Sequence, residues 1–429
     1  MKNPLHLLML LVMLFMSSPV LAQFKLGLEV RPRSEYRNGF KTLNADGKDA
    51  AFFTEQRTRI YAGYTDENLE LMISLQDVRM WGATNQIYKD DPSLTNIHMA
   101  YARYHFNKKW ALAAGRMELN YDNARILGNL GWAQQSRSHD LAQLTYTDST
   151  FAFHFGAAFN QTAEVPEFKK LSGTYYDNNN YKTLQYAWAH KDWKGAKLSL
   201  LAMNVGHQEG IPDSTATVHF MQTLGGILNF NVAPAVKATL EGYYQLGDNP
   251  AGTELSAYMF SAQANWQATD KVSLGAGLDV LSGTEVEETE KSTTFTPLYG
   301  TNHKFYGLMD YFYVGNPHNQ SGKSVGLQDF YVKAGWKAFK KFNAMAHLHF
   351  FSSAVPVINP ESSEEVSSSL GTELDLVIAY SFSKAFNLKA GYSQMFASET
   401  LGYIKTGDPD STNNWAWLML TFKPEFKKL

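Results

Sequence analysis

Arginine is the residue type whose distribution points most directly to chemistry in this chain. The sequence contains ten arginines, and the 292 residues after Arg137 contain none. They are Arg31, Arg33, Arg37, Arg57, Arg59, Arg79, Arg103, Arg116, Arg125 and Arg137. A guanidinium group is planar and donates paired hydrogen bonds to carboxylates and phosphates. The pattern therefore predicts an anion-binding region supplied by the first third of the chain.

Two other groups of residues could do chemistry on paper. Ser138, His139 and Asp140 are the residue types of a nucleophilic triad, but consecutive residues of an extended chain point to alternate sides and cannot converge. His347 and His349 could share one strand face, yet two histidines without a cysteine or carboxylate beside them are more typical of packing than of a metal site. Cysteine is absent, which excludes disulfides and thiolate ligands. We therefore expect the protein to have no enzymatic activity and to bind no metal and no cofactor. We also expect no nucleic-acid partner.

The N-terminal residues predict an export signal. Lys2 precedes the apolar run Leu7 to Phe15, and the small residue Ala22 closes the stretch Val20-Leu21-Ala22. A basic start, a short apolar stretch and a small residue at the end are typical of a cleavable signal peptide. We expect residues 1–22 to be removed and residues 23–429 to form the mature protein.

Apolar residues recur at every second position in stretches of about ten along the mature chain, which is the period of a strand. Leu374, Leu376 and Ile378 fall on one face, whereas Glu373 and Asp375 fall on the other. An apolar face opposite a charged face, repeated over many strands, is typical of a barrel with lipid outside and water inside. A large soluble β-sandwich is the alternative.

The connections between these stretches favour the barrel. Short turns are expected at 65–68, 107–109, 147–150, 192–195, 231–235, 268–271, 338–341 and 383–385, and longer polar segments lie between them. Eight turns and nine loops give an all-β fold: one transmembrane up-and-down antiparallel barrel of about eighteen strands, or sixteen if a long strand has been divided. Such barrels sit in the outer-membrane lipid of a Gram-negative-type bacterium, with the short turns facing the periplasm.

A barrel of this size is too wide for side chains to fill, so it predicts an aqueous channel. Arginine on the lipid face costs about 2–4 kcal/mol at the midplane, so Arg57, Arg59 and Arg103 are expected to face the lumen. They would then form a basic patch on one wall. The alternative is that they pair with lumenal acids such as Glu55 and Glu70 and stiffen the barrel.

Three segments resemble the alginate-export family of outer-membrane barrels. The first runs from Gly115 to Asp140, the second from Thr301 to Asp310, and the third from Gly371 to Leu376. The resemblance implies an eighteen-stranded channel with an arginine-lined constriction, through which an anionic polysaccharide passes. The candidate pore-lining or substrate-binding residues are Arg57, Arg59, Arg79, Arg103, Arg116, Arg125, Arg137, Asp140, His303, Lys304, Asp310, Glu373 and Asp375.

The longest loop, residues 282–322, contains ten large apolar residues between Phe295 and Tyr313. So many rings and aliphatic chains would not gain from a position in water, so the loop is expected to fold into the mouth of the barrel. Lys304 would then extend the basic wall, and Asp310 would tie the loop to it. Packing across the outer rim is the alternative.

Three functions follow as hypotheses. The first is a channel for anionic oligosaccharide or polysaccharide, or for small anionic solutes. The second is a general diffusion porin without substrate selectivity. The third is a structural or adhesive barrel sealed by the loop 282–322. The sequence leaves the solute, the direction of transport and any periplasmic secretion partner open.

Overall fold

The computed structural model describes residues 23–424 except 46, 88–93, 162–179, 211–215, 313, 314 and 316. The expected signal peptide, residues 1–22, lies outside the described residues.

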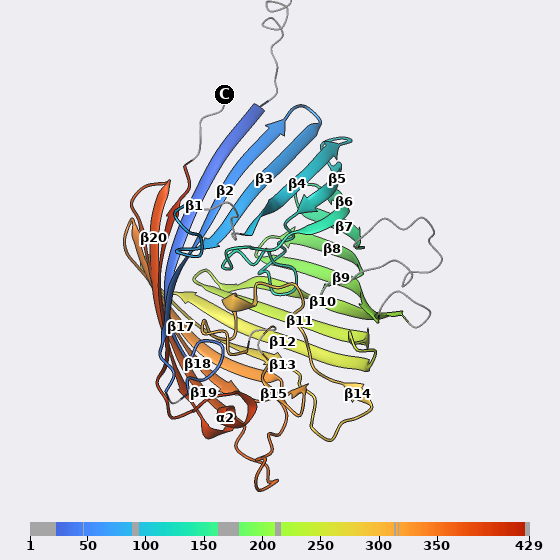
Figure 1. Ribbon diagram of the computed structural model, residues 1–429. Helices are drawn as coiled ribbons and strands as arrows, with labels where there is room; N and C mark the ends of the chain where they lie inside the picture. The colour runs from blue at the N-terminus through green and yellow to red at the C-terminus, as the bar shows by residue number, and fades with distance from the viewer. Residues whose placement is uncertain are drawn as a thin grey trace, which may run out of the picture.

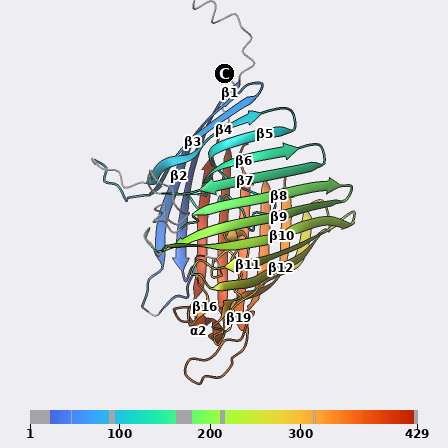
Figure 2. The same ribbon diagram turned by 90° about the vertical axis from the view of Figure 1, so that its right-hand side faces the viewer.

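Eighteen antiparallel strands form a closed barrel (Figure 1), as the alternating pattern predicts. The strands are β1 (Gln23–Asn38), β2 (Ala51–Thr65), β3 (Leu69–Met80), β4 (Leu94–His105), β5 (Trp110–Met117), β6 (His139–Thr147), β7 (Phe151–Phe159), β8 (Thr183–Trp193), β9 (Ala196–Glu209), β10 (Thr217–Ala233), β11 (Val236–Asp248), β12 (Glu254–Gln267), β13 (Val272–Leu281), β17 (Leu327–Phe339), β18 (Phe342–Ser352), β19 (Ser369–Ser381), β20 (Phe386–Ala397) and β21 (Asn413–Phe422). Each pairs with the next, and β21 pairs with β1, so the sheet has no free edge. The strands of the near wall cross those of the far wall obliquely (Figure 2), because closure of a sheet requires tilted strands.

The connections contain only short elements. They are β14 (Lys291–Ser292), β15 (Asn319–Gln320), β16 (Lys323–Ser324), the 3-10 helix η2 (Asn302–Lys304) and the helix α2 (Glu399–Ile404). Within the described ranges, no helix is both long and apolar enough to cross a membrane.

The two faces of each strand differ in the way that the sequence predicts. Leu376 and Ile378 point outward and are 42% and 44% exposed, whereas Glu373 and Asp375 point inward and are fully buried. Successive side chains of a strand alternate between faces, so this register fixes the side of every other residue on β19.

Eight short turns and nine longer connections alternate around the barrel, as expected. We call the two ends of the barrel the turn end and the loop end. Local hydrogen bonds close several turns: the Asp66 carboxylate accepts from the backbone N–H groups of Asn68 and Leu69. These bonds favour the charged form and lower the pKa of Asp66. Asp148 closes the β6–β7 turn in the same way.

Two connections fold back into the barrel. The first inner segment comprises residues 118–138, and the second comprises residues 295–312, including η2, which lies within the barrel outline in Figure 1. The two are joined to each other: Thr301 N–H donates to the carbonyl of Ala124 at 2.8 Å, and Gly128 N–H donates to that of Tyr299 at 2.9 Å. Tyr306 and Tyr311 are buried. The interior position of these rings agrees with the expectation for the loop 282–322.

Candidate functional site

One side of the inner wall is basic. Alternation along β1 and β2 points Arg31, Arg33, Arg57 and Arg59 inward, where all four are buried. They hold the first inner segment: Arg31 donates to the carbonyls of Gly131, Trp132 and Ala133, and Arg33 to that of Trp132.

Arg57 and Arg59 are engaged in the same way. Arg57 pairs with Glu29 and donates to the carbonyl of Gln134 at 3.4 Å. Arg59 donates to Gln76 at 2.6 Å and to the carbonyl of Gln135 at 3.3 Å. These guanidiniums therefore bind the protein's own chain rather than line an open passage, which favours the alternative that they stiffen the wall.

The other side of the inner wall is acidic. Glu241 on β11, Asp279 on β13, Asp329 on β17, and Glu373 and Asp375 on β19 point inward and are buried. We call these five residues the acidic strip. A buried carboxylate needs a cation or hydrogen-bond donors to compensate the lost water.

The first inner segment supplies a cation to the strip. Arg125 Nε lies 2.9 Å from a Glu241 carboxylate oxygen, and its Nη1 lies 3.0 Å from an Asp279 oxygen. Burial alone would lower the pKa of Arg125, but Asp279, Tyr306 and Glu241 raise it well above its ordinary value. Arg125 is therefore a permanently charged partner of two wall carboxylates.

The second inner segment supplies backbone donors. Met309 N–H donates to Glu373 at 2.8 Å, and Leu308 N–H donates to Asp375 at 3.2 Å. His349 on β18 lies between two other acids, with Nδ1 2.9 Å from Asp329 and Nε2 3.6 Å from Asp375. His349 thus packs between two acids of the strip.

Three candidate residues lie on the outer face, contrary to expectation. Arg116 shares its face of β5 with Leu112, is 43% exposed and pairs with Asp140 of β6 at 2.9 Å. Arg79 shares its face of β3 with Leu75 and pairs with Asp77 at 2.6 Å. Both arginines lie at the loop end of their strands, where a charge is not at the midplane and the cost of facing lipid is small.

The remaining candidates face inward. Arg103 lies 3.5 Å from Glu70, and Arg137 donates to the carbonyl of Gly300 at 3.0 Å, which joins the two inner segments. Asp310 accepts from His303 of its own segment at 2.8 Å.

The His303 ring also stacks on Trp132, with ring centroids 4.5 Å apart. His303 therefore adds a further contact between the two inner segments.

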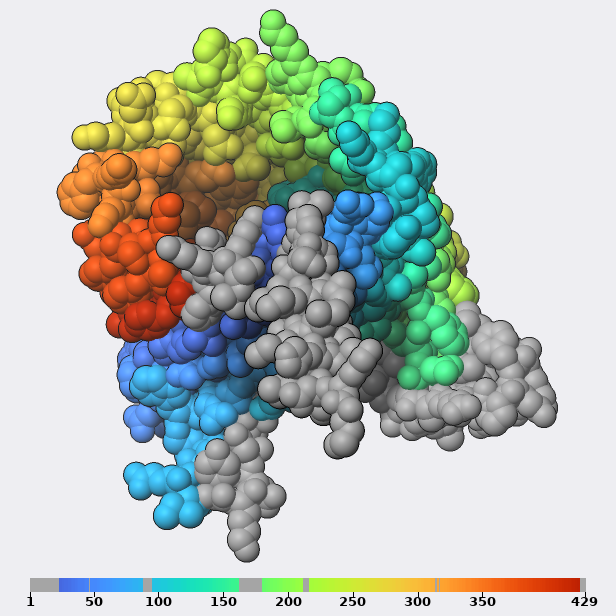
Figure 3. All heavy atoms as spheres, turned by 90° about the horizontal axis from the view of Figure 1, so that it is seen from above, coloured from blue at the N-terminus to red at the C-terminus, as the bar shows by residue number. Residues whose placement is uncertain are grey.

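A cavity of about 530 Å³ lies between the inner segments and the wall. Three lysines reach it: Lys304 from the second inner segment, Lys333 from β17 and Lys389 from β20. Lys304 Nζ donates to the carbonyl of Asn123 at 3.0 Å, and burial followed by the charge of Arg125 lowers its pKa. Seen from the turn end, the wall surrounds a hollow (Figure 3).

The cavity continues toward the turn end. A second space of about 310 Å³ shares Lys333, Met345 and His347 with it and reaches Lys271 of the β12–β13 turn. Lysines line both spaces: Lys304, Lys333 and Lys389 line the first, and Lys271, Lys333 and Lys337 line the second.

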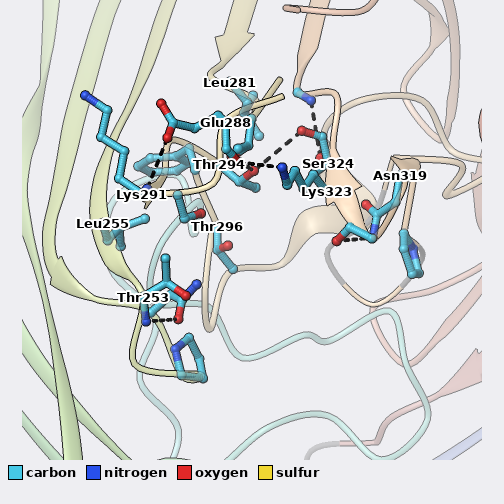
Figure 4. A pocket seen from close by; sticks show the side chains of 18 of the residues that line it. Thr253, Leu255, Leu281, Glu288, Lys291, Thr294, Thr296, Asn319, Lys323 and Ser324 are labelled. Carbon is cyan, nitrogen blue, oxygen red and sulfur yellow. Dashed lines mark hydrogen bonds between the residues drawn. The ribbon is translucent and has the colours of Figure 1, made fainter. Parts of the chain in front are cut away.

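A separate pocket of about 650 Å³ lies at the loop end, between the turn at 249–253 and residues 284–324 (Figure 4). Hydroxyls and two lysines line it, but its groups bind one another: Thr284 and Thr294 share a hydrogen bond of 2.8 Å, and Lys323 Nζ donates to the Val286 carbonyl at 2.6 Å. These bonds shape the long connection between β13 and β17.

Comparison with known proteins identifies the family of the chain. A family model described as alginate export matches residues 22–416. The chain belongs to the alginate-export family. No curated protein matches it significantly.

Solved structures share the fold of this alginate-export family member at low identity. The outer-membrane protein OpdK from Pseudomonas aeruginosa is 11% identical, with a TM-score of 0.59, over 94% of this chain and 99% of that chain. OccAB4 from Acinetobacter baumannii is 11% identical, with a TM-score of 0.62, over 95% and 100%. A BenF-like porin from Pseudomonas fluorescens Pf-5 is 12% identical, with a TM-score of 0.62, over 94% and 99%. Family and fold together support an outer-membrane channel.

Sequence reasoning missed Lys333 and Lys389 and did not recognise the acidic strip. The signal was present, because Glu241 and Asp279 occupy the polar face of strands with a clear alternation. An inward acid on such a strand requires a partner, and here the partner comes from a connection rather than from a neighbouring strand.

Proposed function

We propose that this protein is an outer-membrane channel for anionic solutes, with accessible lysines along the wall from β11 to β21. The solutes are small anions or segments of an anionic oligosaccharide or polysaccharide, in keeping with the family. The turn end faces the periplasm, as short turns do in outer-membrane barrels. Residues 1–22 are a signal peptide that is removed on export.

One observation carries the proposal. Between the acidic strip and the turn end, the inward-facing charged residues of β11 to β21 are Lys237, Lys333 and Lys389, with Lys337 at the end of β17. No inward-facing carboxylate lies on this part of those strands, all of which are described. A cleft lined by charges of one sign concentrates ions of the opposite sign. The lumen beside this wall therefore favours anions.

The test is ion selectivity in planar bilayers. The K333Q/K389Q variant should lower the anion-to-cation permeability ratio, measured from reversal potentials across a salt gradient. The effect should be largest in dilute electrolyte, because charges are screened beyond roughly 8–10 Å at ordinary salt. K340Q/K384Q is the matched control, since it also removes two charges, from exposed residues of the β17–β18 and β19–β20 turns.

Each other hypothesis predicts a different result. A general diffusion porin would keep its reversal potential in K333Q/K389Q, and a barrel sealed by its inner segments would carry no steady current. An oligouronate should interrupt the current of the parent channel, and a neutral glucan of the same length should not. Equal interruption by both sugars would contradict anion recognition.

A further inference from the structure

We infer that Arg125 is the positioning residue for both inner segments, and that its release exposes a cation-preferring wall hidden behind them. The inference rests on the channel function and not on the anion selectivity proposed above. Arg125 is almost completely buried, and it contacts Glu241 and Asp279 of the wall at 2.9 and 3.0 Å.

The same side chain holds the second inner segment. Its Nη1 donates to the hydroxyl of Tyr306 at 2.8 Å, and the ring of Phe305 lies 3.9 Å from its guanidinium carbon. The backbones are equally close: a Cβ atom at Gly300 would lie 1.9 Å from the carbonyl oxygen of Arg125. One residue therefore joins the wall, its own segment and the other segment.

The charges of this cluster explain why Arg125 decides the position of the segments. Removal of its guanidinium leaves Glu241 and Asp279 buried without a cation, which is strongly unfavourable. The wall cannot rearrange to compensate them, because its strands are fixed by continuous backbone pairing from β10 to β17. The segments can rearrange, since they are connections. Water would then enter and hydrate the two carboxylates.

Departure of the segments would change the character of the lumen. The second segment covers Glu373 and Asp375 through its backbone N–H groups, so these two acids would face water together with Glu241 and Asp279, whereas Asp329 would keep His349 of the wall as its partner. The arginines of the opposite wall would be uncovered as well, but Arg33 and Arg57 keep wall carboxylates as partners, Glu35 and Glu55 for Arg33 and Glu29 for Arg57. The acids of the strip would therefore dominate, and an opened barrel would be wider and would prefer cations. This preference is opposite in sign to the selectivity expected of the parent channel.

Single-channel recordings of R125A test the inference. We expect a conductance several-fold above the parent and a reversal potential shifted toward cations. R79A is the control: it removes an arginine of the outer face that pairs with Asp77 of its own strand, and it should keep the parent conductance.

A second variant keeps the inference testable if R125A does not insert into the membrane. E241Q/D279N leaves Arg125 as a buried cation without its partners, so it should also release the segments and raise the conductance. Its shift toward cations should be smaller than that of R125A, because two acids of the strip are gone. Parent conductance in the inserted variants would overturn the inference, and so would a higher conductance without any shift toward cations in R125A.

Discussion

Nη1 of Arg31 lies 2.7 Å from the carbonyl oxygen of Gly131, a residue 100 positions later in the chain. The same guanidinium reaches the carbonyls of Trp132 and Ala133 and the side chain of Gln134. A buried arginine is thus satisfied mainly by neutral backbone acceptors. The basic side of the barrel is a binding site for part of the protein itself.

Replacing Arg31 by methionine should loosen the first inner segment. The variant loses several buried hydrogen bonds and leaves carbonyls unsatisfied, at a cost of about 1–3 kcal/mol for each group that stays dry. Trypsin should then cut after Arg137 faster than in the parent protein in lipid vesicles. The control is R37M, because Arg37 is half-buried and pairs with Glu35. Equal cleavage rates in the two variants would contradict the assigned role of Arg31.

Gly307→Ala should destabilise the second inner segment more than Gly322→Ala. Both glycines have positive φ, +83° and +79°, so both variants carry the backbone cost of about 1–2 kcal/mol. Only at Gly307 does the new Cβ meet an obstacle, 2.6 Å from the Glu373 carboxylate, whereas nothing lies within 4 Å at Gly322. Thermal unfolding in detergent should show the larger fall for G307A. A shift of the same size in both variants would mean that the Glu373 side chain moves away from the new Cβ at little cost in free energy.

Lys405 should make the loop end more stable as the pH rises. Burial lowers the pKa of its ammonium to about 7. Between pH 7 and about 10 the unfolded state binds a proton that the folded state does not, so the free energy of unfolding increases with pH. Below pH 7 both states are charged, and this gain is absent.

K405M lacks the titrating group and provides the comparison. The difference in unfolding midpoint between parent and variant should therefore change between pH 7 and 10 in favour of the parent. A difference that stays constant over this range would show that the Lys405 ammonium is well solvated in the folded protein.

Leu376→Arg should cost about 2–4 kcal/mol of folding free energy if its outward face meets the centre of the bilayer. Ala379→Arg, on the inward face of the same strand, should cost much less because its charge meets water. Urea titrations of folding into lipid vesicles measure both. A larger loss for A379R than for L376R would reverse the assignment of the two faces.

The barrel could be predicted from the sequence because its determinants are local. Alternation along β19 separates Leu376 from Asp375 without knowledge of any other strand, and short turns such as that at Asp66 carry their own hydrogen-bond acceptors. Strand number follows from counting such units.

The interior could not be predicted in the same way. Arg31 is bound by backbone carbonyls, and Glu373 is bound by a backbone N–H group. Backbone groups are the same in every residue, so the sequence does not indicate which of them will bind a side chain. Arg116 does not face the pore as predicted, because the concentration of arginines in the first third of the chain does not specify which face of a strand each one occupies. The register of β5 and the neighbouring Asp140 decide its position.

The partners of the inner segments also constrain the order of assembly. The first segment needs Arg31 and Arg57 near the start of the chain and Asp279 well past its middle, and the second needs Glu373 on β19. These groups face one interior only when β21 has paired with β1. Docking of the segments must therefore be a late event in biogenesis, and insertion intermediates would expose arginines and carboxylates that the finished protein conceals. Chaperones or insertion machinery would meet a far more highly charged molecule than the mature barrel.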